Sequence, residues 1–283
     1  MSLSIFGGEP TIEPRLLLDA VKDGADAGFF VSLVSNLYDL TPKLIDGLGT
    51  AGLKYLGISL DSNHHSDENT ISRGFSLLDY AKSKGIVPVV NTVITSETDT
   101  QTFKQFTNNV LNRGFFISAV PCSPQVPMGE FSNASFSDSP TASQIKELVP
   151  WLAWKKFMTG RVTVSFTYLQ WLYEYGKSNN PQFWHCSPNF RNTSFGPGKG
   201  YLTLDSDGYI GPCQEFPHVV NLLNIPSQNL SLKALNLPFS EVTQKCPGCL
   251  YHCFYMEEKQ KGLATVPELG NGIQVSNVIN NNR

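Results

Sequence analysis

Short apolar runs and helically spaced apolar positions alternate along the first two-thirds of the chain. Five apolar runs have the length expected of buried strands, and they cover residues 3–8, 28–36, 53–62, 85–94 and 114–121. The stretches between them carry apolar residues three and four positions apart, as on one face of a helix, and they cover residues 13–27, 41–52, 70–85 and 100–114. This alternation predicts parallel strands joined by right-handed helical crossovers, either as an open sheet or as a barrel.

Small and polar residues stand at the ends of the predicted strands. In folds of parallel strands, ligands bind at the edge where the carboxyl ends of the strands meet. The residues that fall at this edge are Gly7, Gly8, Ser35, Asn36, Ser59, Asp61 and Asn91. We therefore expect the ligand site there.

The pattern changes after the fifth predicted strand. Residues 141–160 predict a helix that is broken or kinked at Pro150, and residues 163–180 predict a strand leading into another helix. Farther along, the chain becomes rich in Pro, Gly, Asn and Cys, with a predicted hairpin that turns on Asp207 and Gly208. This change of composition indicates a second, smaller domain.

Composition narrows the class of protein. Of the 283 residues, 41% are hydrophobic and 16% are charged, as in an ordinary globular protein with a sizeable core. The formal net charge of -3 gives no support to a nucleic-acid partner, which would favour a basic patch. No apolar run reaches the roughly 18 residues of a membrane span, and no signal peptide is recognisable, so we expect a cytoplasmic location.

The six cysteines are distributed unevenly, with none before Cys122 and five in the last third. In a cytoplasmic chain, closely spaced cysteines favour metal binding over disulfides. Two residues separate Cys246 from Cys249 and three separate Cys249 from Cys253, and such clustered thiolates bind zinc or an iron–sulfur cluster. Cys122 ends a predicted strand and is expected to be a small buried hydrophobe. The candidate metal ligands are Cys186, Cys213, Cys246, Cys249 and Cys253.

The first predicted strand ends in the sequence Gly-Gly-Glu-Pro. Gly7 and Gly8 allow a ligand to approach the backbone closely, and Pro10 ends the strand. The Glu9 carboxylate then projects at the mouth of the strand, where it can pair with a cation such as an ammonium group. The alternative is an ordinary turn between a strand and a helix, with Glu9 solvated.

Four motifs in register resemble the radical S-adenosylmethionine superfamily over residues 4 to about 121. They read GGEPT, VSNLYDL, GISLDS and VVNTVIT. Peptide-modifying members of the superfamily show GGEP, a (T/S)NG-like strand end, SLDG and a strand bearing Asn, in this order and spacing. The chain departs from that pattern at Leu37 and Ser62, where the second and third motifs usually have glycine.

The resemblance implies S-adenosylmethionine as the cofactor. Residues 7–10 would receive the amino group of its methionine part, while Ser59 and Asp61 would lie near its ribose and its carboxylate. The alternative role for Ser59 and Asp61 is a strand cap or a helix start. The implied cofactor-binding residues are Gly7, Gly8, Glu9, Pro10, Ser35, Asn36, Ser59, Asp61 and Asn91.

The chemistry of the superfamily depends on a CxxxCxxC loop, and this sequence contains none. In the family these thiolates hold a 4Fe-4S cluster, and one electron cleaves the cofactor to a 5′-deoxyadenosyl radical that abstracts hydrogen from the substrate. Three explanations compete: a truncated fragment, a split enzyme whose first piece is another chain, and a degenerate non-catalytic relative. We favour truncation, because the remaining ligand-site residues are intact. We expect the chain alone to be inactive, with an exposed barrel edge that promotes aggregation.

The cysteine-rich third resembles the SPASM or twitch extensions that follow the barrel in the same superfamily. The spacing of Gly208 and Cys213 matches their pattern, and five cysteines imply one auxiliary 4Fe-4S cluster. Cys186 is the rival or a nearby fifth thiol, and a structural zinc knot is the alternative. The four implied ligands are Cys213, Cys246, Cys249 and Cys253.

Together these features predict an α/β fold, a partial (β/α)6 TIM-like barrel over residues 1–180, followed by a small cysteine-rich cluster domain over residues 181–283. The resemblance implies an enzyme that reductively cleaves S-adenosylmethionine and abstracts hydrogen from an unknown substrate, a peptide or a small molecule. A flavodoxin- or ferredoxin-like reductant would be its partner. The competing hypothesis is a non-catalytic, zinc-bearing interaction module. A barrel aldolase ranks last, because none of the five predicted strands ends in the lysine that it would need.

Overall fold

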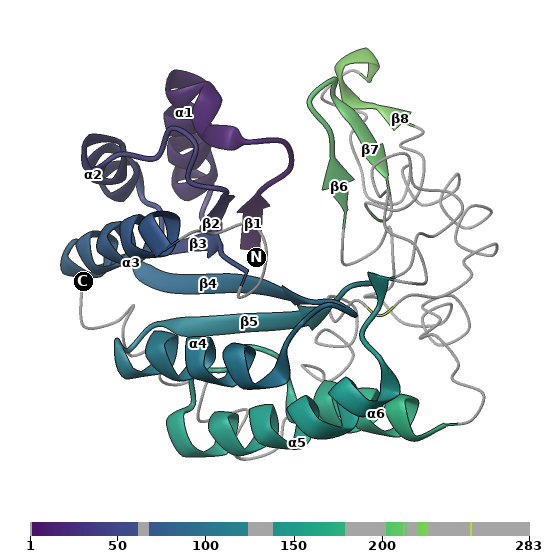
Figure 1. The fold of residues 1–283 in the computed structure, drawn as a ribbon. Coiled ribbons are helices and arrows are strands. Elements are labelled where there is room, and N and C mark those ends of the chain that lie inside the picture. Colours follow the sequence, from purple (N-terminus) through teal and green to yellow (C-terminus); the bar gives the residue numbers. More distant parts are fainter. Residues whose placement is uncertain are drawn as a thin grey trace.

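The computed structural model describes residues 2–61, 68–123, 138–178, 202–211, 213, 220–225 and 250. Its centre is a sheet of five strands in the order β1-β2-β3-β4-β5 (Figure 1). The strands are β1 (Ser2–Ile5), β2 (Phe30–Ser35), β3 (Tyr55–Ser59), β4 (Val87–Ile94) and β5 (Phe116–Pro121). Each strand pairs in parallel with the strand before it, so all five predicted strands and the α/β class are confirmed.

Helices connect the consecutive strands and continue after the last one. Because the strand order is sequential and such crossovers are right-handed, the helices cover one face of the sheet. Neighbouring helices pack together, α1 on α2, α2 on α3, α4 on α5 and α5 on α6, which is the arrangement of a partial barrel (Figure 1). The helices are η1 (Pro10–Ile12), α1 (Pro14–Asp26), α2 (Pro42–Ala51), α3 (Glu68–Ser83), α4 (Thr100–Asn112), α5 (Ala142–Thr159) and α6 (Phe166–Lys177).

A single bridge marks a sixth strand position beside β5. Val162 pairs in parallel with Ile117. The Ile117 N–H donates to the Arg161 carbonyl at 2.9 Å, and the Thr163 N–H donates to the Ile117 carbonyl at 2.9 Å. The strand predicted within residues 163–180 is therefore reduced to this short contact, and α6 begins directly after it at the same edge of the sheet.

Local sequence sets both ends of α5. Thr141 and Gln144 form a capping box, in which each side chain receives a backbone N–H of the other residue. Gly160 ends the helix in the left-handed region, at φ +68°. The helix continues through Pro150, so it is not broken there, and the alternative of a kink at this residue stays a prediction.

The hydrophobic core lies between the sheet and the helices. Ile58, Val90 and Ile117 are register partners across β3, β4 and β5, and all three are fully buried. From α4, Phe103 is also fully buried. Burial of one such side chain stabilises the fold by about 2 kcal/mol, so this face holds the sheet to its helices. The opposite face of the strands carries apolar side chains, such as the paired rings of Phe30 and Tyr55, together with polar ones such as Asn91.

A second, antiparallel sheet lies beyond the carboxyl ends of β4 and β5 (Figure 1). Its predicted hairpin is confirmed: Gly208 has a φ of +84°, and the Asp205 carboxylate accepts the backbone N–H groups of Asp207 at 3.0 Å and Tyr209 at 2.8 Å. The third strand was not predicted. The elements are β6 (Thr203–Leu204), β7 (Tyr209–Gly211), β8 (Val220–Asn221) and η3 (Leu222–Asn224). The division of the chain into two domains near residue 180 stays a prediction.

None of the helices in the described ranges combines the length and the hydropathy that crossing a membrane requires.

Candidate functional site

Gly7 and Gly8 give the loop after β1 a backbone conformation that other residues rarely adopt. Their φ angles are +93° and +53°, both in the left-handed region. Apart from the adjacent residues, no atom of the described part of the chain lies within 4 Å of the position that a Cβ would take at either residue. The restriction on these two positions is therefore conformational, and their backbone borders open space that a ligand can enter.

The Glu9 carboxylate joins the end of β1 to the end of β2. Its Oε1 accepts the Ser35 hydroxyl at 2.8 Å, the Thr11 hydroxyl at 2.5 Å and the Thr11 N–H at 3.1 Å. Its Oε2 accepts the Asn36 N–H at 2.7 Å. Glu9 is half-buried, is held by four donors and is the N-cap of η1, so it takes part in the turn between strand and helix, and its role toward a ligand stays a prediction.

The same contacts keep Glu9 ionised. Burial alone would raise the pKa of Glu9, but the hydrogen bonds from Thr11, Asn36 and Ser35 outweigh it and hold this pKa below its usual value. A carboxylate has about four acceptor sites, and only one donor reaches Oε2 in the described part of the chain. The Oε2 atom therefore has capacity for a further donor, and the negative charge favours a cationic one.

Leu37 adopts the backbone conformation that a glycine usually provides. Its φ is +77°, and among the described residues no other non-glycine residue has a positive φ. Its N–H donates to the Ser35 hydroxyl at 3.1 Å, and its side chain is 2% exposed. Burial of the leucine thus offsets a backbone cost of about 1–2 kcal/mol. The departure from the glycine-containing motif leaves the left-handed turn in place.

Asn36 stands beside this turn at the surface. Its side-chain oxygen accepts the Tyr38 N–H at 3.0 Å, which forms a turn closed by an Asn side chain. The Asn36 backbone N–H is the donor to Glu9. The structure therefore brings residues 7–10 of the first motif against Ser35 and Asn36 of the second.

A polar row crosses the face of the sheet that points away from the helices. Ser59, Asn91 and Ser118 are register partners on β3, β4 and β5. Ser59 is exposed, and Asn91 and Ser118 are half-buried. Ser118 was missed in the sequence, although the alternation of buried and partly buried positions along β5 would have placed it on this face. The row offers hydroxyl and amide groups to a ligand inside the partial barrel.

The Asp61 side chain connects the segment after β3 to β4 by hydrogen bonds. Its Oδ1 accepts the Val93 N–H at 2.8 Å and the Thr92 hydroxyl at 3.3 Å. It therefore ties the segment after β3 to β4, in agreement with the alternative of a capping role. Within the described ranges, no protein donor is hydrogen-bonded to the second carboxylate oxygen of Asp61.

The cysteines are described only in part. Cys213 follows β7 and is buried, while Cys122 follows β5 and is half-buried. Burial, and then the charge of Asp138, raise the pKa of the Cys122 thiol. Within the described ranges, no three His, Cys, Asp or Glu side chains gather closely enough to hold a metal ion. Four of the five candidate metal ligands lie outside the described residues, namely Cys186, Cys246, Cys249 and Cys253.

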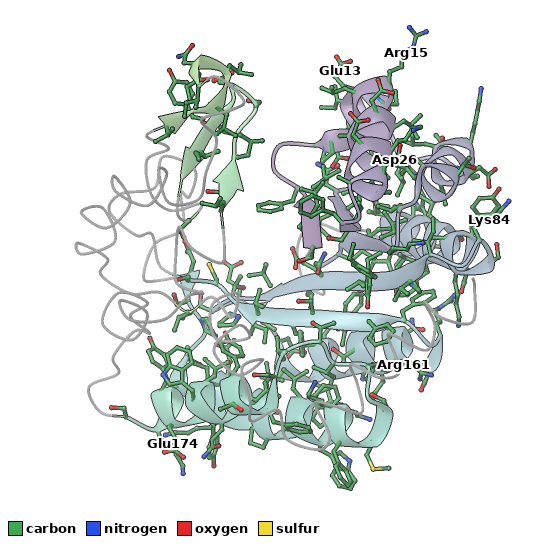
Figure 2. All side chains as sticks on the ribbon, turned by 180° about the vertical axis from the view of Figure 1, so that it is seen from behind. Glu13, Arg15, Asp26, Lys84, Arg161 and Glu174 are labelled. Carbon is green, nitrogen blue, oxygen red and sulfur yellow. The ribbon has the colours of Figure 1, made fainter. Side chains whose placement is uncertain are left out.

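Charged side chains gather on the outside of the partial barrel. Figure 2 shows Arg15, Lys84 and Glu174 pointing away from the sheet, each on or beside a helix. The inner face instead carries the neutral polar row. At the mouth between β1 and β2, Glu9 supplies an ionised group bound to Ser35 and Asn36.

No protein-family model and no curated protein sequence matches the chain. Solved structures do resemble it. SuiB from Streptococcus suis, solved bound to S-adenosylmethionine, has a TM-score of 0.56 at 16% identity, over 85% of this chain and 55% of SuiB. SuiB solved bound to the precursor peptide SuiA gives a TM-score of 0.57 at 15% identity, over 86% of this chain and 56% of SuiB.

A second similar protein matches along the whole chain. The structure of anSMEcpe with bound AdoMet and the Cp18Cys peptide has a TM-score of 0.55 at 17% identity, over 100% of this chain and 86% of anSMEcpe. The chain spans little more than half of SuiB but most of anSMEcpe. At these identities the likeness establishes the fold alone, and it confirms the predicted partial barrel.

Proposed function

From the radical S-adenosylmethionine fold of this chain, we propose that it binds S-adenosylmethionine and forms the cofactor- and substrate-binding part of a radical enzyme. The observation that carries the proposal is Glu9, an ionised carboxylate held by four donors at the mouth between β1 and β2. Its Oε2 would accept the ammonium group of the cofactor's methionine part. The open backbone of Gly7 and Gly8 would let that group approach.

The remaining residues fit the rest of the cofactor. Ser59 and Asn91 present a hydroxyl and an amide at the carboxyl ends of β3 and β4, where ribose hydroxyls and a carboxylate find partners. Asp61 would act through its second oxygen, because its first is occupied by β4. We propose that Pro10, Ser35 and Asn36 act by shaping the loop and holding Glu9.

When bound, a reduced 4Fe-4S cluster would supply the electron that cleaves the cofactor's carbon–sulfur bond and starts hydrogen abstraction. The sequence contains no CxxxCxxC, so the thiolates for that cluster are not among these residues. Activity therefore belongs to an assembly that provides them, together with a flavodoxin- or ferredoxin-like reductant. The auxiliary cluster would be held by Cys213 and by candidates outside the described residues.

A peptide is the substrate class that we propose. SuiB and anSMEcpe have both been solved with peptides bound. In this chain Ser118 continues the neutral row on the face of the sheet opposite the helices, next to Asn91 and beyond the residues proposed for the cofactor. Hydroxyl and amide groups of this kind suit the N–H and C=O groups of a peptide backbone better than a charged or purely apolar molecule.

The first test is equilibrium binding of S-adenosylmethionine to the purified chain by calorimetry. We expect Glu9→Gln to weaken binding about ten- to hundredfold, since a hydrogen bond between charged groups contributes roughly 1.5–3 kcal/mol. Glu13→Gln is the matched control, because Glu13 is an exposed acid close by with no side-chain capping bond. Methylthioadenosine lacks the amino group, so its affinity should be the same for the parent chain and for Glu9→Gln. Equal weakening of both ligands would show that Glu9 acts only on the loop.

A further inference from the structure

The hydroxyl of Thr11 connects Glu9 to the segment that follows β2. It donates to the Glu9 Oε1 atom at 2.5 Å and accepts the Asp39 N–H at 3.3 Å. Thr11 is fully buried within η1, and its own N–H also donates to Glu9 Oε1, at 3.1 Å. A single buried residue thus orients the carboxylate and holds the backbone at Asp39.

All four backbone N–H groups of residues 36–39 are bound by side-chain oxygens. Three of these oxygens belong to Glu9, Ser35 and Thr11, and the fourth belongs to Asn36 itself. The bonds run from Asn36 to Glu9 Oε2 at 2.7 Å, from Leu37 to Ser35 Oγ at 3.1 Å, from Tyr38 to Asn36 Oδ1 at 3.0 Å and from Asp39 to Thr11 Oγ1 at 3.3 Å. Because Ser35 and Thr11 both donate to Glu9, this segment is joined to the carboxylate at three points.

These contacts fix the direction of two hydroxyl protons. A hydroxyl carries one proton, and a backbone N–H can only donate. The Thr11 hydroxyl accepts the Asp39 N–H, so its proton is available for Glu9. The Ser35 hydroxyl stands in the same relation to Leu37 and Glu9. Both hydroxyls therefore bind the carboxylate form of Glu9, and both would lose their acceptor if Oε1 were protonated.

The result is a carboxylate that offers one of its two oxygens. A carboxylate has about four acceptor sites, and three donors from Ser35 and Thr11 already reach Oε1. Burial raises the pKa of Glu9, while among the described residues hydrogen bonds rather than neighbouring charges lower it, with the Thr11 hydroxyl foremost. The single buried hydroxyl of Thr11 thus has a large influence on which oxygen of Glu9 is free and on its charge.

We propose that Thr11 is a positioning residue for cofactor binding: it turns the Glu9 carboxylate so that Oε2 faces the ligand, and it couples this carboxylate to residues 36–39. This role deepens the proposed function and rests on it, because the donor expected at Oε2 is the ammonium group of the cofactor. Thr11 is fully buried, so it acts through Glu9. Ligand binding at Oε2 should in turn protect the amides of residues 36–39 from hydrogen exchange.

The first experiment needs no ligand. Thr11→Val keeps the shape and removes the hydroxyl, whereas Thr11→Ser keeps the hydroxyl. Thr107→Val is the matched control, because Thr107 is equally buried and its hydroxyl has no hydrogen-bond partner within the described ranges. Carbon NMR of the chain labelled at the glutamate carboxyl carbon, assigned with Glu9→Gln, follows the pKa of Glu9. We expect this pKa to rise in Thr11→Val and to stay at the parent value in Thr11→Ser and Thr107→Val.

The second experiment measures binding and local exchange in the same variants. We expect Thr11→Val to weaken S-adenosylmethionine about fivefold, the effect of one hydrogen bond, and Thr11→Ser to restore the affinity. Methylthioadenosine lacks the amino group, so its affinity should be unchanged. In Thr11→Val the amides of residues 36–39 should exchange faster, while those of α4 keep the parent rates.

The outcomes separate the role of Thr11 from the proposed function. An unchanged pKa of Glu9 and unchanged exchange of residues 36–39 in Thr11→Val overturn the positioning role and leave the proposed function standing. Equal weakening of both ligands without rescue by Thr11→Ser also overturns it, because Thr11 then only packs. A parent chain that does not bind S-adenosylmethionine contradicts the proposed function, and a raised pKa of Glu9 in Thr11→Val would still support the positioning of the carboxylate.

Discussion

The side-chain amide of Asn91 lies directly over Gly57 on the neighbouring strand. A Cβ at residue 57 would be 2.5 Å from the Asn91 Nδ2 atom, closer than real Cβ atoms come to other atoms. The absence of a side chain at Gly57 therefore determines where Asn91 can place its amide. Since Asn91 belongs to the polar row, this contact links a buried glycine to the candidate ligand site.

We expect Gly57→Ala to displace Asn91 and to weaken binding of S-adenosylmethionine. Overpacking of this kind should lower the free energy of unfolding by about 1–3 kcal/mol. Gly49→Ala is the control, because a Cβ at that position in α2 meets Ile86 at an ordinary 3.5 Å. Chemical denaturation and calorimetry measure the two effects. The double variant Gly57→Ala/Asn91→Ala should recover stability, and a double variant as unstable as Gly57→Ala would contradict the steric account.

At Leu37, we expect the glycine variant to be more stable than the alanine variant, which is the reverse of the usual order. Leu37→Ala loses buried apolar surface and keeps the strained left-handed backbone, whereas Leu37→Gly loses the same surface and relieves the strain. We therefore expect Leu37→Gly to be more stable than Leu37→Ala by about 1 kcal/mol in urea unfolding. In β2, the corresponding variants of Leu33 should show the ordinary order, with alanine the more stable. The same order at both positions would mean that the turn at Leu37 relaxes.

Glu9 should make the stability of the chain depend on pH on the acid side. Its pKa is lower in the folded chain than the ordinary value of 4.5, so folding favours the ionised form. This contribution is complete above about pH 4.5 and is lost as the pH falls through the folded-state pKa. The difference in unfolding free energy between the parent chain and Glu9→Gln, measured by urea titration from pH 7 to pH 3, should shrink over that window. A constant difference would mean that the hydrogen bonds to Glu9 do not depend on its charge.

Thr107 is expected to be a site where a polar group can be removed with a gain in stability. It is fully buried in α4, and its hydroxyl has no hydrogen-bond partner. Thr107→Val keeps the shape and removes the unsatisfied hydroxyl, so we expect a gain of about 1 kcal/mol. Thr92→Val should instead lose stability, because the Thr92 hydroxyl donates to Asp61. Thermal melting of the two variants measures both signs, and a loss of stability in Thr107→Val would point to a partner for its hydroxyl.

The sequence predicts the sheet well, because buried parallel strands and amphipathic helices leave strong periodic signals. The runs that contain Ile58, Val90 and Ile117 became strands with those residues in the core. The sequence pattern was a weaker guide to secondary structure where a single residue or contact determines whether a helix continues. The break expected at Pro150 did not occur, since packing and caps at both ends sustain α5 around it.

Within the candidate site, the sequence indicated which residue types gather at the strand ends but not which of them are already engaged. Nothing in the residue order shows that Asp61 reaches across to Val93, or that Leu37 takes over the conformation of a glycine. The contacts of Leu250 with Ser123 and Tyr168 are equally invisible, because the partners are separated by many residues. Contacts of this kind depend on the tertiary arrangement, which periodicity does not report.

The long sequence separation between Leu250 and its hydrogen-bond partners Ser123 and Tyr168 has a consequence for folding. The Ser123 hydroxyl reaches its position only when β5 has joined the sheet, and the Tyr168 hydroxyl only when α6 has packed. Contacts between residues this far apart in the sequence form slowly, because loop closure precedes them, so we expect the contacts of Leu250 to be among the last of the fold to form.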